Sequence, residues 1–308
     1  MLGLPGKSFT GPVPPPTSDE EDLAKRLQRH VTEIASKPHN VAHYAELEKS
    51  AAYIVAVLKA YEYEPRSQVF DTEGRSVRNI EAVIEPEGAG PETETIVVGA
   101  HYDSAGIAPG ANDNATGAAA VIELARLLKD LRPKNKRLRL VLFVNEEPPY
   151  DRTPNMGSWR YAQMLKQRGE HVSGMMSLET LGCFSDAPGS QKYPPPFGLF
   201  FPNKANFIAF VALPGGRDFL HHVVGPFRRH TELPTIGGTA PDQFDGVGWS
   251  DHWSFSKHGF PAIMITDTAL FRYPHYHKAT DTPDKVDYAK LARITLGLEQ
   301  TLRELVSN

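Results

Sequence analysis

Hydrophobic residues recur along the chain in two patterns. From Leu23 to Ile34 they follow the spacing of one helix face, and we expect Ser18 to cap this helix, with three acids in its first turn. The other pattern is a short unbroken apolar run, such as residues 95–100, which is typical of a strand covered on both faces. The two patterns alternate, which predicts helices and strands in turn.

The same patterns give a set of expected elements. We expect helices at residues 18–34, 44–61, 118–131, 158–168 and 287–306. We expect strands at residues 67–72 and 77–85, which form an antiparallel hairpin, and at residues 95–100, 137–145, 174–179 and 261–266. Strands that alternate with helices favour an α/β fold with a mostly parallel sheet.

Two segments depart from this alternation. Residues 1–17 are rich in proline and glycine, and we expect an extended arm. Residues 184–250 are rich in proline and glycine around two expected helices. We interpret them as an insertion that shapes the substrate pocket within one domain, residues 18–308.

The composition narrows the class of protein. The 308 residues carry a formal net charge of −4, so we expect no nucleic-acid partner. One cysteine, Cys183, allows no intramolecular disulfide. No run approaches the roughly 18 apolar residues that a membrane span needs. Residues 1–30 lack the apolar core of a signal peptide, so we expect a cytoplasmic protein, or a secreted or periplasmic one if a leader has been removed.

Acids and histidines lie where the expected strands end. These residues are His101, Asp103, Glu146, Glu147, Glu179 and Asp267. Asp113 lies just before the helix that follows the first of these strands. Because ligands of α/β sheets bind at the carboxyl ends of the strands, we expect these side chains to converge on one edge.

The stretch around Asp113 allows more than one interpretation. Glycines 106, 110 and 117 do not have the spacing of a dinucleotide loop, and the neighbouring carboxylates would repel phosphate. Asn112 or Asp113 could simply cap the following helix. However, Glu146 and Glu147 follow an apolar strand, and two acids at a buried position need cationic partners. Histidines and carboxylates suit zinc, and the set favours a two-metal hydrolytic site.

Six motifs then resemble a known family. In chain order they read HYD, NDNATG, NEE, SLETLG, SDHWSF and YHKATDTPD, over about residues 77–306. They resemble the co-catalytic zinc aminopeptidases, family twenty-eight of the metallopeptidases, which includes bacterial leucine aminopeptidases and whose fold the glutaminyl cyclases share. The resemblance implies a three-layer α/β/α sandwich with a mixed, mostly parallel sheet, and a peptide substrate.

The resemblance also implies a set of metal ligands. It implies two zinc ions per chain, bridged by Asp113. His101 and Glu179 would complete the first zinc site, and Glu147 and His277 the second. Many members of the family have aspartate where this chain has Glu179.

Four further positions match catalytic roles in the family. Glu146 resembles the general base, and Tyr276 resembles the phenol that hydrogen-bonds the tetrahedral intermediate. Asp103 would lie behind His101 and orient it. Asp251 matches a pocket-wall position that serves catalysis in the cyclases.

The resemblance implies an exopeptidase, and among exopeptidases it favours an aminopeptidase. The alternatives are a glutaminyl-peptide cyclotransferase, a carboxypeptidase on the same scaffold, and a non-catalytic binding domain without metals. Metal content and substrate choice separate these alternatives.

Overall fold

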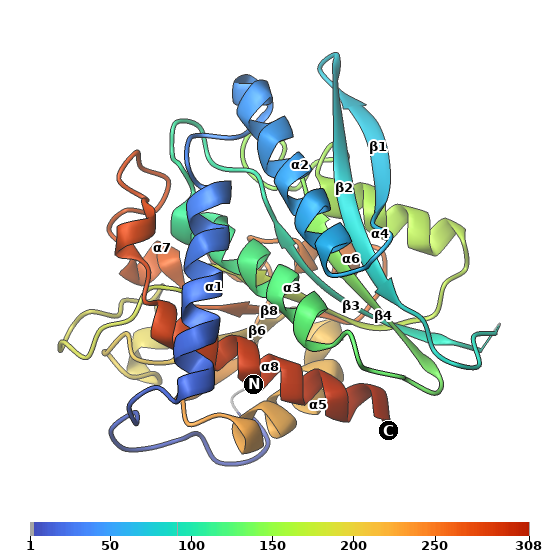
Figure 1. Ribbon diagram of the computed structural model, residues 1–308. Helices are drawn as coiled ribbons and strands as arrows, with labels where there is room; N and C mark the ends of the chain where they lie inside the picture. The colour runs from blue at the N-terminus through green and yellow to red at the C-terminus, as the bar shows by residue number, and fades with distance from the viewer. Residues whose placement is uncertain (1–2, 91, 308) are drawn as a thin grey trace.

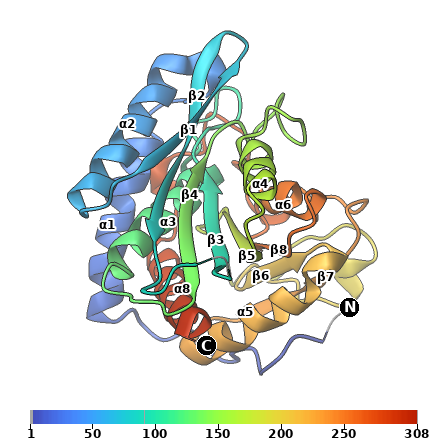
Figure 2. The same ribbon diagram turned by 90° about the vertical axis from the view of Figure 1, so that its right-hand side faces the viewer.

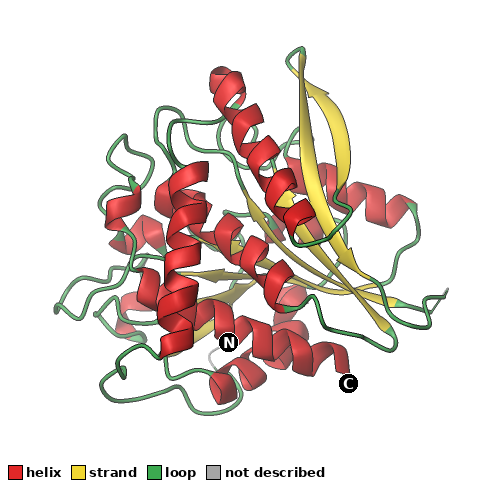
Figure 3. Ribbon diagram, in the orientation of Figure 1, coloured by secondary structure: helices red, strands yellow, loops and turns green. Residues whose placement is uncertain are grey.

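The computed structural model describes residues 3–90 and 92–307, and it contains one eight-stranded sheet with helices on both faces (Figures 1 and 3). The strands are β1 (Arg66–Thr72), β2 (Arg75–Ile84), β3 (Glu94–His101), β4 (Lys136–Phe143), β5 (Val172–Glu179), β6 (Ile208–Ala212), β7 (Thr235–Thr239) and β8 (Ala262–Thr266). The helices are α1 (Ser18–Ile34), α2 (Tyr44–Ala60), α3 (Thr116–Leu127), α4 (Gly157–Gln167), α5 (Arg217–His230), α6 (His252–Lys257), α7 (Ala269–Arg272) and α8 (Tyr288–Ser307). Within the described residues, no helix combines the length and apolar character that crossing a bilayer requires.

The sheet is mixed, and its order is β1-β2-β4-β3-β5-β8-β6-β7. The four central strands β4, β3, β5 and β8 are mutually parallel. The hairpin β1–β2 joins antiparallel to β4 at one edge, and β6 joins antiparallel to β8 near the other, with β7 parallel to β6. Because the four central strands run in the same direction, their carboxyl ends lie next to one another at the same end of the sheet.

Alternate side chains of each central strand enter different helical layers. In β4, Leu140 and Leu142 pack on the side of α1, α2, α3, α5 and α8, whereas Val141 and Phe143 pack against α4 and α6. Figure 2 shows α1, α2 and α3 on one side of the sheet and α4 and α6 on the other. The expected three-layer α/β/α sandwich is therefore confirmed. Burial on both faces explains the unbroken apolar runs of the central strands.

Outside residues 184–250, every helix and strand expected from the sequence is present, with end points that differ by a few residues. The cap of α1 is a correction. Thr17, and not Ser18, is the N-cap: its hydroxyl accepts the Glu20 N–H, and the Glu20 carboxylate accepts the Thr17 N–H. This reciprocal pair is a capping box, which needs the acid three residues after the cap.

The insertion differs from the expectation of two helices. It holds one long helix, α5, and the strands β6 and β7, which extend the sheet beyond β8. The apolar run of residues 207–213 forms β6 because it can pair with the antiparallel β8. The two strands thus attach the insertion to the main sheet.

The amino-terminal segment has neither helix nor strand over residues 3–17. The expected arm of residues 1–17 begins two residues earlier, and residues 1 and 2 lie outside the described part. Arg228 of α5 donates hydrogen bonds to the carbonyls of Pro5 and Gly6, and Arg293 of α8 donates one to Pro15. The segment therefore lies along α5 and α8.

Candidate metal centre

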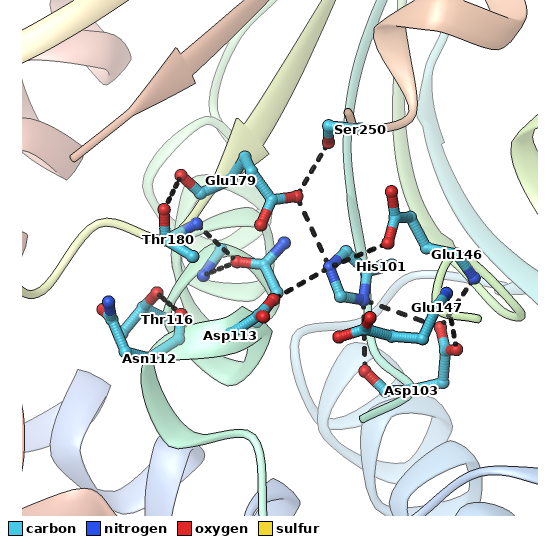
Figure 4. A network of polar contacts seen from close by, with 12 residues as sticks. His101, Asp103, Asn112, Asp113, Thr116, Glu146, Glu147, Glu179, Thr180 and Ser250 are labelled. Carbon is cyan, nitrogen blue, oxygen red and sulfur yellow. Dashed lines mark hydrogen bonds and ion pairs between the residues drawn. The ribbon is translucent and has the colours of Figure 1, made fainter. Parts of the chain in front are cut away.

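Three carboxylates surround His101, the last residue of β3 (Figure 4). Its Nε2 lies 3.4 Å from Asp113 Oδ1, 3.4 Å from Glu179 Oε2 and 3.8 Å from Glu146 Oε2. Glu179 ends β5, the strand parallel to β3 on one side, and Glu146 follows β4 on the other side. The parallel register brings these strand ends together, as expected from the sequence.

The same Asp113 also faces a second histidine. His277 Nε2 lies 3.1 Å from Asp113 Oδ2 and 3.2 Å from Glu147 Oε2. The two oxygens of Asp113 thus face different histidines. Three groups of possible metal ligands result: His101–Asp113–Glu179 and Asp113–Glu147–His277, which share Asp113, and His101–Glu146–Glu147.

The main chain around Asp113 is held in place by neighbouring residues. Gly110 has φ of +74°, and a Cβ there would lie 2.6 Å from the Asp113 carbonyl oxygen, so the turn requires glycine. The Asp281 carboxylate accepts the N–H groups of Asn112 and Asp113, at 2.9 and 3.1 Å. Tyr273 donates to the same carboxylate at 2.6 Å. Asp113 is therefore not a helix cap: it lies in an irregular turn, Ala111–Ala115, and its own backbone is not helical.

Asp103 organises the two glutamates that follow β4. Its carboxylate accepts the N–H of Glu146 at 3.1 Å and the N–H of Glu147 at 3.3 Å. His101 Nδ1 lies 3.1 Å from the Asp103 carbonyl oxygen and 3.6 Å from its carboxylate. Asp103 does lie behind His101, but the nearer acceptor is its main-chain oxygen, since the carboxylate is engaged by the glutamate backbone.

Non-glycine residues in the left-handed region occur at three places in the site. They are Asn145 (φ +61°) before Glu146, Thr180 (φ +50°) after Glu179, and His277 itself (φ +57°). Each costs on the order of 1 kcal/mol relative to ordinary backbone. Such cost is typical of sites where the backbone must aim a side chain.

Two serine hydroxyls support Glu179. Ser250 Oγ donates to Glu179 Oε2 at 2.7 Å, and Ser177 Oγ lies 2.8 Å from Ser250 Oγ. Asp251, next in the chain, is completely buried, and burial raises the pKa of its carboxyl to about 7 despite the opposing effect of His101. This predicted catalytic position therefore lies within the charge field of the centre.

Burial and the charges of the carboxylates shift the pKa values of the groups in the centre. Burial and the Asp113 charge raise the pKa of Glu147 to about 8. Burial also raises the pKa of Glu146 well above its usual range. Against the effect of burial, hydrogen bonds to Asp113 and Glu147 raise the pKa of His277 to about 11, and the Glu179 and Glu146 charges raise that of His101. Both shifts follow from the carboxylate charge around the histidines, which a metal cation would balance.

The donor set fits metal ions. His101 Nε2, Asp113 Oδ2 and Glu147 Oε1 are buried and make no hydrogen bond of acceptable geometry within residues 3–90 and 92–307. Buried polar atoms without partners are costly, and metal cations at the two donor groups that share Asp113 would satisfy all three. Imidazole nitrogens with carboxylate oxygens are a donor set that zinc accepts.

Comparison with known proteins agrees with this chemistry. The model of peptidase family M28 matches residues 79–302. The chain belongs to peptidase family M28. It is 35% identical to the uncharacterized protein YfbL of Escherichia coli, over 93% of this chain and 88% of that protein. It is 28% identical to a probable leucine aminopeptidase of Arthroderma benhamiae, over 68% of this chain and 54% of that protein, so it spans about half of that fungal relative.

Solved structures agree with the M28 fold. An aminopeptidase from Aneurinibacillus sp. strain AM-1 superposes with a TM-score of 0.71 at 17% identity, covering 94% of this chain and 96% of that one. The glutaminyl cyclase of Fimbriiglobus ruber superposes with a TM-score of 0.67 at 18% identity, covering 96% and 97%. The shared fold thus includes both an aminopeptidase and a cyclase.

An apolar pocket opens beside the candidate metal centre of this M28 chain. Glu179 and Tyr276 line the end next to the centre. Its walls come from separate segments and include Tyr193, Phe197, Phe201, Val211, Ile236, Val247, Trp249, Met264, Leu270 and Phe271. Tyr276 stacks on the His277 ring, with centroids 3.9 Å apart. Several aromatic residues of the segment 184–250 thus line this pocket, and the sequence did not show which ones.

Two supporting residues of the centre were not recognised from the sequence. Asp281 and Ser250 lie in the motifs YHKATDTPD and SDHWSF, but their hydrogen-bond partners, Asp113 and Glu179, are distant along the chain. The motifs carried the signal that these residues matter. Only the folded chain shows what each one holds.

Proposed function

We propose that this M28 chain is a two-zinc aminopeptidase that releases large apolar residues from the amino terminus of peptides. The observation that carries the proposal is the pair of donor groups that share Asp113, directly beside an apolar pocket. A substrate whose first side chain fills the pocket would present its first peptide bond to the centre. Two metals joined by a carboxylate are a known arrangement of hydrolytic sites.

The donor groups assign the ligands. His101 and Glu179 would hold one zinc ion, Glu147 and His277 the other, and Asp113 would bridge them. Bound zinc ions would polarise the scissile carbonyl and lower the pKa of water in the site. The carboxylates would contribute the compensating negative charge.

Glu146 supports the role of general base. Glu146 belongs to neither of the two donor groups that share Asp113, and burial raises its pKa well above the usual range, so that it can hold a proton. Glu146 takes a proton from the attacking water, whose oxygen bonds to the carbonyl carbon. It then gives that proton to the leaving amine as the carbon–nitrogen bond breaks.

Tyr276 supports the role of oxyanion donor. Burial and the charges of Asp113 and Glu147 raise the pKa of its phenol well above the usual value, so the hydroxyl keeps its proton. It lines the pocket at the end next to Glu179. The phenol can therefore donate a hydrogen bond to the oxygen of the tetrahedral intermediate.

The charge of the pocket favours an amino-terminal substrate over a carboxyl-terminal one. Glu179 and Asp245 are its charged lining residues, and neither lysine nor arginine lines it within the described residues. A peptide carboxylate would meet negative charge there, whereas an α-ammonium group would meet carboxylates. This supports an aminopeptidase rather than a carboxypeptidase.

The test is a panel of chromogenic aminoacyl substrates with leucine, phenylalanine, alanine and arginine, assayed with and without a chelator, together with cyclisation of an amino-terminal glutaminyl peptide. We expect hydrolysis of the leucine and phenylalanine substrates above the others, loss of activity with the chelator, and recovery with zinc. Cyclisation without hydrolysis would establish the cyclase alternative. A metal-free protein inactive on every substrate would establish the binding domain.

A further inference from the structure

The guanidinium of Arg272 lies behind the pocket and joins parts of the chain that form its walls. Arg272 ends the short helix α7. Its NH1 lies within hydrogen-bond distance of the carbonyl oxygens of Cys183 (3.1 Å), Ala205 (3.3 Å) and Phe207 (3.0 Å). Its Nε donates to Gln191 Oε1 at 2.7 Å. One side chain therefore contacts three residues of the insertion and Cys183, which directly precedes it.

Aromatic rings complete the setting of this guanidinium. Its central carbon lies 4.3 Å from the centroid of the Phe207 ring and 5.7 Å from that of Phe184. A planar guanidinium can stack on a ring while its edge donates hydrogen bonds, which an ammonium group cannot match. Arg272 does not line the pocket itself, so it does not bind the substrate side chain.

Gln191 continues the connection from the insertion to α7. Its side chain is buried and donates to the Lys192 carbonyl at 2.7 Å and to Thr268 Oγ1 at 3.0 Å. The Lys192 N–H donates to the Phe271 carbonyl at 3.1 Å. Arg272 and Gln191 thus bind the segment that precedes Tyr193 to the helix that carries Leu270 and Phe271.

The segment held in this way has little structure of its own. Residues 180–207 connect β5 to β6 with a single three-residue 3₁₀ turn, Phe197–Leu199. A long connection without regular structure depends on side-chain contacts for its conformation. Tyr193, Phe197 and Phe201 of this segment form one part of the pocket wall, and residues 268–271 form another part.

We propose that Arg272 is a positioning residue for specificity: by tying residues 183–207 to α7 it keeps the two walls of the pocket apart at a fixed distance and selects large apolar amino-terminal residues. The proposal rests on the proposed aminopeptidase function. An alanine side chain does not reach these walls, so its hydrolysis does not depend on their separation.

The test variants are Arg272→Met, which keeps the aliphatic stem, Arg272→Lys, which keeps the charge without the planar fork, and Gln191→Leu. Lys290→Met is the matched control, because Lys290 lies 5.5 Å from the Phe184 ring but its ion pair is with Asp287. We expect both Arg272 variants to lose roughly 10- to 100-fold in kcat/KM on a leucine substrate, mainly through KM, and less than about threefold on an alanine substrate. Lys290→Met keeps the wild-type ratio of the two substrates.

Two further measurements exclude other causes. Zinc content must stay at the wild-type value, because Arg272 contacts the Cys183 carbonyl, and the Cys183 N–H donates to Asp267, which also accepts a hydrogen bond from Asn112 beside Asp113. Calorimetry of L-leucine and L-alanine binding measures the properties of the pocket without catalysis. We expect the Arg272 variants to bind L-leucine more weakly than the wild-type protein and to bind L-alanine with the wild-type affinity. If the wild-type protein hydrolyses neither substrate, the aminopeptidase proposal fails while this binding experiment still decides the role of Arg272.

Three results would overturn the proposal. They are an unchanged leucine-to-alanine ratio in Arg272→Met, an equal loss on both substrates, and full selectivity in Arg272→Lys. If the Arg272 variants do not fold, Gln191→Leu decides, because it removes the contacts to Arg272 Nε and to Thr268 and leaves the guanidinium with its three carbonyl partners. An unchanged leucine-to-alanine ratio in Gln191→Leu would then overturn the proposal.

Discussion

The carboxylate of Asp281 accepts the backbone N–H of Asp113 at 3.1 Å. Its other oxygen accepts the N–H of Asn112, and the phenol of Tyr273 donates to that same oxygen. These contacts set the orientation of the one carboxylate that faces both His101 and His277. The position of the proposed bridging ligand therefore depends on an acid that binds no metal itself.

Asp281→Asn should weaken metal binding at both proposed zinc positions. The amide nitrogen that replaces one carboxylate oxygen cannot accept the backbone N–H, so the turn that carries Asp113 shifts. We expect roughly a 10- to 100-fold loss of zinc affinity, measured by competition with a chromogenic chelator. Asp284→Asn, which changes an exposed acid paired with Lys285, is the control and should bind zinc normally. Normal affinity in Asp281→Asn would contradict the positioning role.

Glu146→Gln should keep its metal and lose turnover. Glutamine fills the same space but cannot take a proton from water, so kcat should fall by about 10²–10⁴-fold on the leucine substrate. Kinetics and metal analysis of the same preparation measure the two quantities. Glu87→Gln, at an exposed loop position, serves as the control. A rate near the wild-type value would rule out Glu146 as the base.

Ser250→Ala tests how Glu179 is held. Without the 2.7 Å hydrogen bond from Ser250, the longer glutamate side chain is free to leave the position beside His101. We expect zinc to be lost first from the site of His101 and Glu179, with roughly tenfold lower affinity there. Titration of the metal-free protein with zinc should then show two separated steps. Ser173→Ala, a serine of β5 farther from the centre, should titrate like wild type.

His252 should make the fold less stable in mild acid. Burial lowers the pKa of its imidazole from 6.5 to about 4, and Nε2 lies 2.8 Å from the Val247 carbonyl oxygen. Between these values the unfolded chain binds a proton that the folded chain does not. The stabilisation by neutral His252 is thus complete above about pH 6.5 and lost as the pH falls to about 4, up to roughly 3 kcal/mol.

His252→Gln keeps a donor near the Val247 carbonyl and removes this titration. Urea unfolding of the metal-free proteins at pH 7.5 and pH 5 should therefore show a smaller loss of stability for the variant than for wild type. His222→Gln, at an exposed position of α5, is the control and should follow wild type. Parallel losses in His252→Gln and wild type would contradict the assignment.

Local signals were sufficient for the central sheet and for the residues at its edge. The runs that become β3, β4, β5 and β8 are buried on both faces, so their apolar character is visible without knowledge of their neighbours. Residues that end such strands must share one edge when the strands are parallel. That is why His101, Glu146 and Glu179 could be grouped before any distance was known.

Contacts between distant segments decided the rest. Residues 235–239, which contain two glycines, form β7 only because β6 lies beside them, and β6 in turn depends on β8. The pocket and Arg272 follow the same rule, since their walls and partners come from separate parts of the chain. The sequence by itself determined the kind of chemistry, because ligand types and strand ends are local properties. Only the tertiary structure decided which side chains hold Asp113 and Glu179 and which segments form the walls of the pocket. Hydrogen bonds and packing between distant segments leave no periodic pattern in the sequence.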